Sequence, residues 1–248
     1  MNLLLLEPAE IRSDGTSVVS DGRARHLQDV LRVQPGQDVR VGVIDGGLGT
    51  GTVLSLGDGT VTLRCTFDAI PARPSVDLLL ALPRPKVMRR LWAQVAALGV
   101  GQTILTNAER VERNYFDTHV LEPDVYRPLL LEGLQQARDT RLPLVSIHRR
   151  LKVLVEDDLD SLCPRGVRLV AHPGSTLTFR AALDTNPAYV AGGQTRTLLA
   201  VGPEGGWTDF ELQLLAAHGF GVVGMGARTL RSDTACVALL ALLHEAIR

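Results

Sequence analysis

The sequence predicts an α/β domain with a mostly parallel sheet, preceded by a small β-barrel domain. Up to about residue 70, short alternating segments are separated by tight turns, which is typical of a small barrel. After residue 75, continuous apolar runs alternate with helical patterns, as in a sheet whose strands are buried on both faces. The segment from Pro71 to Pro74 resembles a linker. We therefore expect one domain over residues 1–70 and a second over residues 75–248.

The expected elements of the first domain are three strands and one helix. Asp45-Gly46-Gly47 and Asp58-Gly59 are turn signals between the strands. Ala24, Leu27 and Leu31 share one face of a helical pattern. The strands are predicted over residues 39–44, 51–56 and 61–67, and the helix over residues 23–31.

The expected elements of the second domain alternate between strands and helices. Pro85 suits a first helical turn, and Gly99 suits the end of that helix. The strands are predicted over residues 76–82, 102–106, 144–148, 167–171, 197–201 and 222–225. The helices are predicted over residues 85–98, 123–136 and 151–162, after Thr208, and from Ser232 to the C-terminus.

The composition is that of a folded protein with no strong overall charge. Hydrophobic residues make up 45% and charged residues 21% of the 248 residues, and the formal net charge is -1. This excludes a disordered chain, and it requires any nucleic-acid-binding surface to concentrate its cations on one face. Cys65, Cys163 and Cys236 form no CxxC pair, and the six histidines show no metal-ligand spacing. We expect a cytoplasmic protein without a metal site or a membrane span, because no apolar stretch approaches about 18 residues.

The segment from Gly202 to Gly206 is the strongest candidate for a ligand site. An apolar strand runs into Gly202-Pro203-Glu204-Gly205-Gly206, and Thr208 with Glu211 three residues later forms a capping-box pattern. Ligands of open α/β sheets bind at the carboxyl ends of strands. Glycines allow close backbone approach, and the free amides of a helix start donate hydrogen bonds. An ordinary strand-to-helix turn would need fewer glycines, so a ligand-binding loop is favoured.

A second polar loop is expected beside the first. The predicted strand over residues 222–225 leads into Arg228, Arg231, Ser232 and Asp233, and a strongly apolar helix follows. Ser232 is expected to cap that helix. Two adjacent strand ends with polar loops predict one shared site.

These two segments together resemble the C-terminal signature of the RsmE family, the 16S rRNA (uracil-N3)-methyltransferases. The matching runs are Gly202 to Gly206 and, about twenty residues later, Met225-Gly-Ala-Arg-Thr-Leu-Arg-Ser-Asp-Thr-Ala235. Further stretches resemble the same family over nearly the whole chain: Arg25-His26-Leu27, Ala81-Leu82-Pro83, Leu98-Gly99-Val100, Glu109-Arg110, and Glu132 with Gln136 and Arg138.

The resemblance implies a PUA-like barrel and a SPOUT domain with a C-terminal trefoil knot, acting as a homodimer. It implies methyl transfer from S-adenosylmethionine to N3 of a uridine in 16S rRNA of the small ribosomal subunit. The cofactor-binding residues that it implies are Leu169, Ala171, His172, Pro173, Val201, Gly202, Pro203, Glu204, Gly205, Gly206, Met225, Gly226, Leu230, Ser232, Thr234 and Ala235.

For catalysis we expect a cation that stabilises the negative charge left on uracil when its N3 proton departs. Arg231 is the candidate for that role, and Glu204 or Asp233 would orient groups or accept the proton. RNA is expected to be bound by basic residues spread over both domains: Arg23, Arg25, Arg32, Arg84, Lys86, Arg89, Arg90, Arg110 and Arg138.

Several positions depart from the family pattern and keep two alternatives open. Gln94, Ala97 and Gln135 stand where the family usually has charged residues, and Asp233 stands where it usually has Glu. One alternative is a SPOUT methyltransferase acting on another base or on a ribose 2′-hydroxyl of rRNA or tRNA. The other is a non-catalytic RNA-binding factor.

Overall fold

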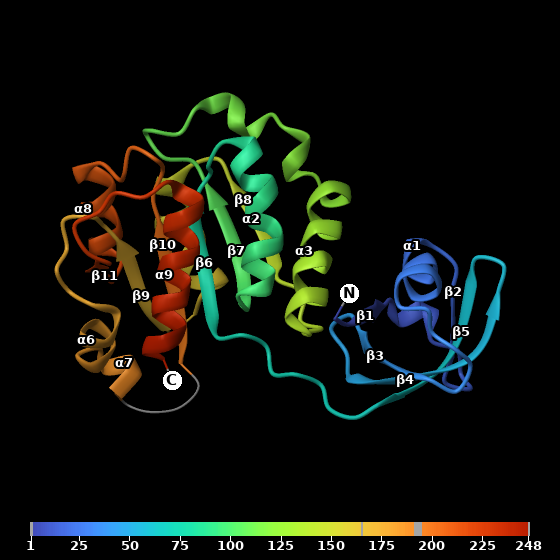
Figure 1. The fold of residues 1–248 in the computed structure, drawn as a ribbon. Coiled ribbons are helices and arrows are strands. Elements are labelled where there is room, and N and C mark those ends of the chain that lie inside the picture. Colours follow the sequence, from blue (N-terminus) through green and yellow to red (C-terminus); the bar gives the residue numbers. More distant parts are fainter. Residues whose placement is uncertain (1, 165, 191–194, 248) are drawn as a thin grey trace. The chain divides into compact units, whose positions relative to one another are not determined.

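The computed structural model describes residues 2–164, 166–190 and 195–247, which fall into two compact units (Figure 1). The first unit comprises Met1–Arg73 and Leu131–Leu142, and the second comprises Pro74–Leu130 and Pro143–Arg248. The segment 131–142 joins the first unit through backbone and side-chain hydrogen bonds. Asp45 N donates to Thr140 O at 2.8 Å, and Thr140 Oγ1 donates to Gly46 O at 2.7 Å.

The first unit contains a five-stranded sheet around a small apolar core. The three predicted strands are confirmed: the first is shifted by one residue towards the N-terminus, the second is longer at both ends, and the third begins one residue earlier. Leu6, Val41 and Leu63 are fully buried in the core. The sheet order is β1-β3-β4-β5-β2, with β1 (Leu4–Leu6), β2 (Thr16–Val19), β3 (Asp38–Val43), β4 (Leu48–Gly57) and β5 (Thr60–Phe67). A short helix η1 (Pro8–Glu10) follows β1, and α1 (Gly22–Arg25) continues into the π-helical η2 (His26–Val30).

The second unit contains a six-stranded sheet in which every pair of neighbours is parallel, as the sequence predicts. All six residues of β6 are buried, because both faces of the sheet are covered. The order is β11-β9-β10-β6-β7-β8, with β6 (Val76–Ala81), β7 (Val100–Thr106), β8 (Leu144–His148), β9 (Gly166–Ala171), β10 (Arg196–Val201) and β11 (Phe220–Val223).

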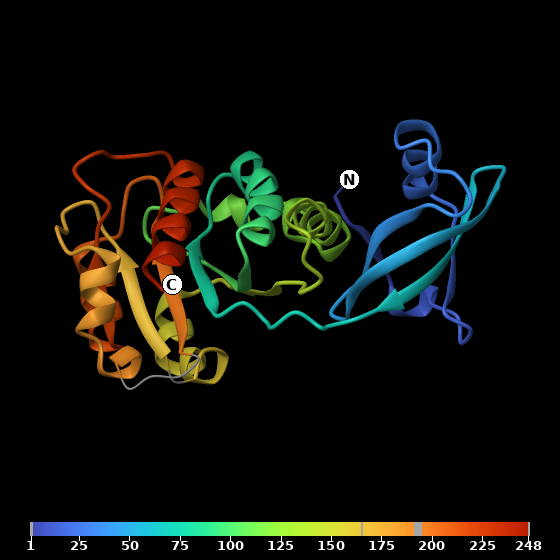
Figure 2. The same ribbon diagram turned by 60° about the horizontal axis from the view of Figure 1, so that its bottom comes forward.

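Helices α2 and α9 lie side by side across one face of this sheet (Figures 1 and 2). Leu91 and Trp92 of α2, and Leu240 and Leu243 of α9, are fully buried. The helical bounds are α2 (Pro85–Ala97), η3 (Arg113–Phe116), η4 (His119–Leu121), α3 (Pro123–Ala137), α4 (Leu151–Val153), η5 (Leu154–Asp158), α5 (Leu159–Leu162), α6 (Phe179–Asp184), α7 (Pro187–Val190), α8 (Asp209–Ala217) and α9 (Ser232–Ala246). None of the helices described is long and apolar enough to cross a membrane.

The strand order creates a point where the direction of winding reverses. The chain builds β6, β7 and β8 outward in one direction, then crosses over to β9 and inserts β10 between β9 and β6. Ligands of open parallel sheets bind at the carboxyl ends of strands near such a reversal. A ligand site is therefore expected at the loops after β9, β10 and β11.

Candidate functional site

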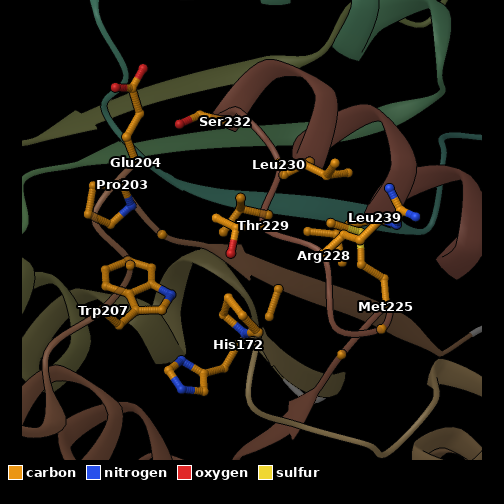
Figure 3. A pocket seen from close by; sticks show the side chains of 18 residues that line it. His172, Pro203, Glu204, Trp207, Met225, Arg228, Thr229, Leu230, Ser232 and Leu239 are labelled. Carbon is orange, nitrogen blue, oxygen red and sulfur yellow. The ribbon is translucent and has the colours of Figure 1, made fainter.

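A hollow of about 90 Å³ lies between the loops that follow β9, β10 and β11 (Figure 3). Its lining includes His172 from the first loop, Trp207 from the second and Met225 from the third. Leu239 of α9 adds an apolar wall. The two polar loops expected from the sequence thus lie together, and the loop after β9 completes the site.

The loop after β10 is fixed by the start of α8. The predicted capping box is confirmed: Thr208 Oγ1 accepts from Glu211 N at 3.3 Å, and Glu211 accepts from Thr208 N at 2.8 Å. Trp207 is 3% exposed and lies against Gly202, where an added Cβ would be 3.0 Å from the indole nitrogen. A side chain at 202 would require the indole to shift by a few tenths of an ångström.

The loop after β11 is tied to the loop after β9. His172 N donates to Val223 O at 2.9 Å, and Gly224 N donates to Leu177 O at 3.0 Å. A Cβ on Gly224 would lie 2.1 Å from Ser175 O, so a side chain there would force the two loops apart. The glycine at 224 is thus required by packing between the loops.

Three buried polar atoms at the hollow have no hydrogen-bond partner among the described residues: His172 Nδ1, Trp207 Nε1 and Ser232 Oγ. Leaving such groups unpaired costs about 1–3 kcal/mol each. The prediction that Ser232 caps α9 is wrong, because Arg231 occupies the N-cap position and Ser232 is the first helical residue. Its buried hydroxyl therefore lines the hollow instead of capping the helix.

The two candidate acids are held by arginines at the N-cap and in the second turn of α2. Arg84 lies 3.2 Å from Glu204, and Arg90 lies 2.5 Å from Asp233. The hydrogen bond from Arg90 holds the pKa of Asp233 below its usual value, which makes this carboxylate a weak base. The side chain of Glu204 points away from the hollow (Figure 3).

The basic residues of the loop after β11 differ in position. Arg228 lines the hollow, whereas Arg231 is exposed and does not. No ion pair of either residue is recorded within the part of the chain that the structure describes. Both guanidinium groups are therefore free to meet an anionic ligand.

Most residues expected to bind the cofactor line the hollow. Thr234 is exposed, Leu169 is buried within β9, and Gly205 lies beneath Arg110, so these three do not line it. The place of Leu239 in the lining could have been predicted, because it follows Ala235 by one helical turn. The places of Trp207 and Gly224 could not, because they depend on how the loops pack together. The lining residues that were expected are Ala171, His172, Pro173, Val201, Gly202, Pro203, Glu204, Gly206, Met225, Gly226, Leu230, Ser232 and Ala235, with Arg228 and Thr229 inside the predicted second loop, and those not expected are Trp207, Gly224 and Leu239.

The basic residues expected to bind RNA fall into two groups. In the first group the side chain is engaged within the protein. Arg23 pairs with Glu10 and Asp21, Arg84 and Arg90 hold the two acids, and Arg110 donates to Gly205 O. Those of the second group are exposed and have no recorded ion pair among the described residues: Arg25, Arg32, Lys86, Arg89 and Arg138.

Neither a metal-binding group of side chains nor a reactive thiol is found among the residues that the structure describes. No group of three or more His, Cys, Asp or Glu side chains in them could hold a metal ion. Burial raises the pKa of the Cys65 thiol to about 11, and it raises those of Cys163 and Cys236 to about 12. Thiols with such pKa values are poor nucleophiles.

Two family models match the chain. One, described as an RNA methyltransferase domain, matches residues 71–244, and the other, an RNA methyltransferase PUA domain, matches residues 19–64. The α/β fold and the PUA-like domain expected from the sequence are thereby confirmed. Residues 71–244 contain all the loops around the hollow.

Solved structures share the fold over nearly the whole chain. A ribosomal RNA small subunit methyltransferase E from Neisseria gonorrhoeae, bound to S-adenosyl methionine, has a TM-score of 0.76 at 21% identity, covering 99% of this chain and 97% of that one. A methyltransferase from Legionella pneumophila, in complex with the same cofactor, has a TM-score of 0.73 at 21% identity, covering 99% and 97%.

Curated relatives match at higher identity. Ribosomal RNA small subunit methyltransferase E of Treponema pallidum is 30% identical over 98% of this chain and 92% of its own length. The protein of that name from Synechocystis is 28% identical over 97% of this chain and 76% of its own length. The resemblance seen in the sequence is confirmed, and the chain belongs to the RNA methyltransferases of the ribosomal RNA small subunit methyltransferase E family.

Proposed function

We propose that this chain transfers a methyl group from S-adenosylmethionine to N3 of a uridine in the 16S rRNA of the small ribosomal subunit. Family membership supports the reaction class. The observation that carries the proposal is the hollow at the strand ends, where His172, Trp207 and Ser232 keep buried polar atoms without partners. Protein groups that are buried and unsatisfied gain most from a ligand that pairs with them.

The lining suits S-adenosylmethionine, which has apolar and polar parts. Pro173, Leu230 and Leu239 offer apolar contacts, and the three unpartnered atoms offer hydrogen bonds. Ligand pockets usually measure about 300–1,000 Å³, and this hollow measures about 90 Å³. Binding of the cofactor therefore requires the lining of the hollow to open.

The reaction places two demands on the site. The bound cofactor supplies an electrophilic methyl group, and N3 of uracil must face it without its Watson–Crick partner, so the target base is unpaired or flipped out. The N3 proton passes to solvent water, and the negative charge left on the base is stabilised by a cation. Arg231 takes this role, because it is exposed beside the hollow on the same loop as Arg228.

Glu204 and Asp233 act by positioning. Each is held in an ion pair with an arginine of α2 or its N-cap, and Asp233 stays ionised because Arg90 lowers its pKa. These pairs fix Arg84 and Arg90 near the cofactor loops, where they can meet RNA phosphates. Lys86 and Arg89, exposed on the same helix, extend that surface.

The remaining parts of the proposal follow the family resemblance. Residues 75–248 form a SPOUT domain with a C-terminal trefoil knot, and residues 1–70 form the PUA-like domain that docks RNA. The enzyme is a homodimer in the cytoplasm, and it needs no metal. Arg25, Arg32 and Arg138, all exposed, are the candidates for RNA contacts in the first unit.

The test is transfer of labelled methyl to small ribosomal subunits from a strain lacking this gene, followed by nucleoside mass spectrometry. We expect 3-methyluridine, and we expect Arg231→Ala to lower kcat roughly a hundredfold, in line with loss of one charge-stabilising group. Arg64→Ala, which removes an exposed arginine of β5, should leave kcat unchanged. A methyl on ribose would select the 2′-hydroxyl alternative. No incorporation despite cofactor binding would refute the rRNA target.

A further inference from the structure

A second, larger hollow begins where the cofactor loop ends. Trp207 lines the first hollow, and the next residue, Thr208, lines the second, whose volume is about 660 Å³. Asn107 and Arg113, from the segment after β7, form one wall, and Phe210 of α8 forms another. We call this hollow, lined by Asn107, Arg113, Lys152, Thr208, Phe210 and Leu214, the Phe210 groove.

Phe210 is unusual because a large aromatic ring is left open to solvent. Its exposed fraction is 63%, although it lies in the first turn of a helix whose Leu215 is fully buried. An exposed aromatic ring beside a hollow is the platform on which single-stranded nucleic acids stack their bases. Phe210 thus provides a stacking surface next to the cofactor loop.

Asn107 supplies a polar contact inside the groove. Its side-chain oxygen is buried and has no partner among the residues that the structure describes. Its backbone is held in place, because Asn107 N donates to His148 O at 3.2 Å. An acceptor fixed in this way can receive a hydrogen bond from the edge of a base or from a ribose hydroxyl.

The lining of the groove contains two cations, Arg113 and Lys152, and two carboxylates, Glu109 and Glu211. The Glu211 carboxylate is already used, because it accepts from Glu109 N at 2.7 Å and from Thr208 N at 2.8 Å. Glu109 is the exposed carboxylate of the lining, and Lys152 Nζ lies 3.9 Å from Glu156, so Arg113 is the cation of the groove without an ion pair among the described residues. Cations beside an aromatic platform are the combination that binds a phosphate backbone and its bases together.

The groove is held at a fixed position relative to the cofactor loop. Glu211 joins the segment after β7 to the start of α8 through the two bonds to Glu109 and Thr208. Arg110 reaches back from the same segment and donates to Gly205 O. A nucleotide in the groove would therefore have a fixed distance to a base presented at the first hollow.

We infer that the Phe210 groove binds a single-stranded RNA nucleotide next to the one that is methylated, with its base stacked on Phe210. The inference rests on the proposed function, and it assigns a binding site for the RNA substrate outside the cofactor hollow. It also agrees with the requirement for an unpaired target, because a neighbouring nucleotide can stack on the protein only when it leaves its own helix.

The test compares the binding of a fluorescein-labelled decamer of uridine with that of a labelled RNA hairpin duplex. Phe210→Ala should weaken binding of the single strand roughly tenfold, as expected for the loss of one base–aromatic stack, and should leave duplex binding unchanged. Phe210→Trp should restore binding of the single strand, and Asn107→Ala should weaken it several-fold. Leu144→Ala, at an exposed apolar residue of β8, is the matched control and should change neither affinity.

Activity measurements separate this inference from the proposed function. Phe210→Ala should raise the KM for small subunits about tenfold, with kcat and the Kd for S-adenosylmethionine unchanged. The inference fails if the wild type methylates and Phe210→Ala matches it in both KM and affinity for the single strand. It also fails if Phe210→Ala changes the oligomeric state measured by light scattering, which would make the groove a protein interface. If the wild type forms no 3-methyluridine but Phe210→Ala still weakens single-strand binding, the groove stands and the reaction is wrong.

Discussion

Buried polar groups at the amino and carboxyl ends of the second sheet have different surroundings. At the amino end, the Asp77 carboxylate of β6 is 1% exposed and accepts two hydrogen bonds from Arg196 of β10, at 2.9 and 2.5 Å. At the carboxyl end, His172, Trp207 and Ser232 have buried polar atoms without partners among the described residues. The Asp77–Arg196 pair satisfies its own polar groups, although Thr197 Oγ1 beside it is buried without a described partner, whereas the hollow leaves three polar atoms for a ligand.

The comparison predicts that substitutions at the two ends will separate stability from binding. The largest effect is expected for Asp77→Ala, which leaves the partly buried Arg196 guanidinium without its partner. Breaking such a pair costs about 3 kcal/mol of unfolding free energy. Urea denaturation followed by tryptophan fluorescence measures it, because Trp92 and Trp207 both belong to this unit.

Two further variants control this prediction. Asp160→Ala removes the exposed partner of Arg168 and should leave the urea midpoint unchanged within error. Asp77→Leu combined with Arg196→Met should recover most of the stability, because replacing both charges by apolar groups removes the unpaired ion. If Asp77→Ala shifts cofactor affinity as much as stability, the two ends are not independent and the comparison fails.

A smaller effect, on binding alone, is expected at the carboxyl end. Ser232→Ala removes a buried hydroxyl that has no recorded partner, so the free protein should keep its unfolding free energy or gain a few tenths of a kcal/mol, since alanine is the better helix former by about 0.5 kcal/mol. Calorimetry should show cofactor binding weakened by roughly five- to tenfold, the value of one hydrogen bond. A loss of stability with unchanged affinity would mean that this hydroxyl has a structural role.

The smallest expected effect is on the pH dependence of the unfolding free energy, to which Asp77 and Asp233 contribute with opposite sign. Burial raises the pKa of Asp77 despite Arg196, so its contribution to stability is present below its unfolded pKa, near 3.8, and is lost as pH rises through the folded value. Arg90 lowers the pKa of Asp233, so its contribution is present above pH 3.8 and is lost as pH falls. Comparing wild type with Asp77→Asn and with Asp233→Asn between pH 3 and 6 should give stability differences of opposite slope. Slopes of the same sign would contradict this assignment.

The sequence predicted the second sheet well, for a physical reason. The apolar runs that became β6 and β10 are buried on both faces, so they can be recognised without any knowledge of their neighbours. β1 and β2 were missed, because three or four residues show no clear alternation. The expected strand over residues 222–225 lies two residues earlier, at Phe220–Val223, so Gly224 and Met225 belong to the loop.

The features of the site that were predicted are those encoded by residues close together in the sequence. The capping box joins Thr208 to Glu211, three residues later, and is visible in the sequence. The pair between Arg90 and Asp233 joins residues 143 positions apart, and no local sequence pattern predicts it. Ser232 lines the hollow and does not cap α9, because the helix begins at Ser232 itself. Tertiary packing decides at which residue a helix begins.

Amide hydrogen exchange with and without saturating S-adenosylmethionine tests most directly whether the carboxyl end of the sheet is the ligand site. We expect slower exchange in residues 170–175, 202–208 and 224–235, which form the three loops around the hollow, and no change around Asp77 and Arg196. Protection confined to other segments, or none at saturation, would contradict the assignment of this hollow to the cofactor.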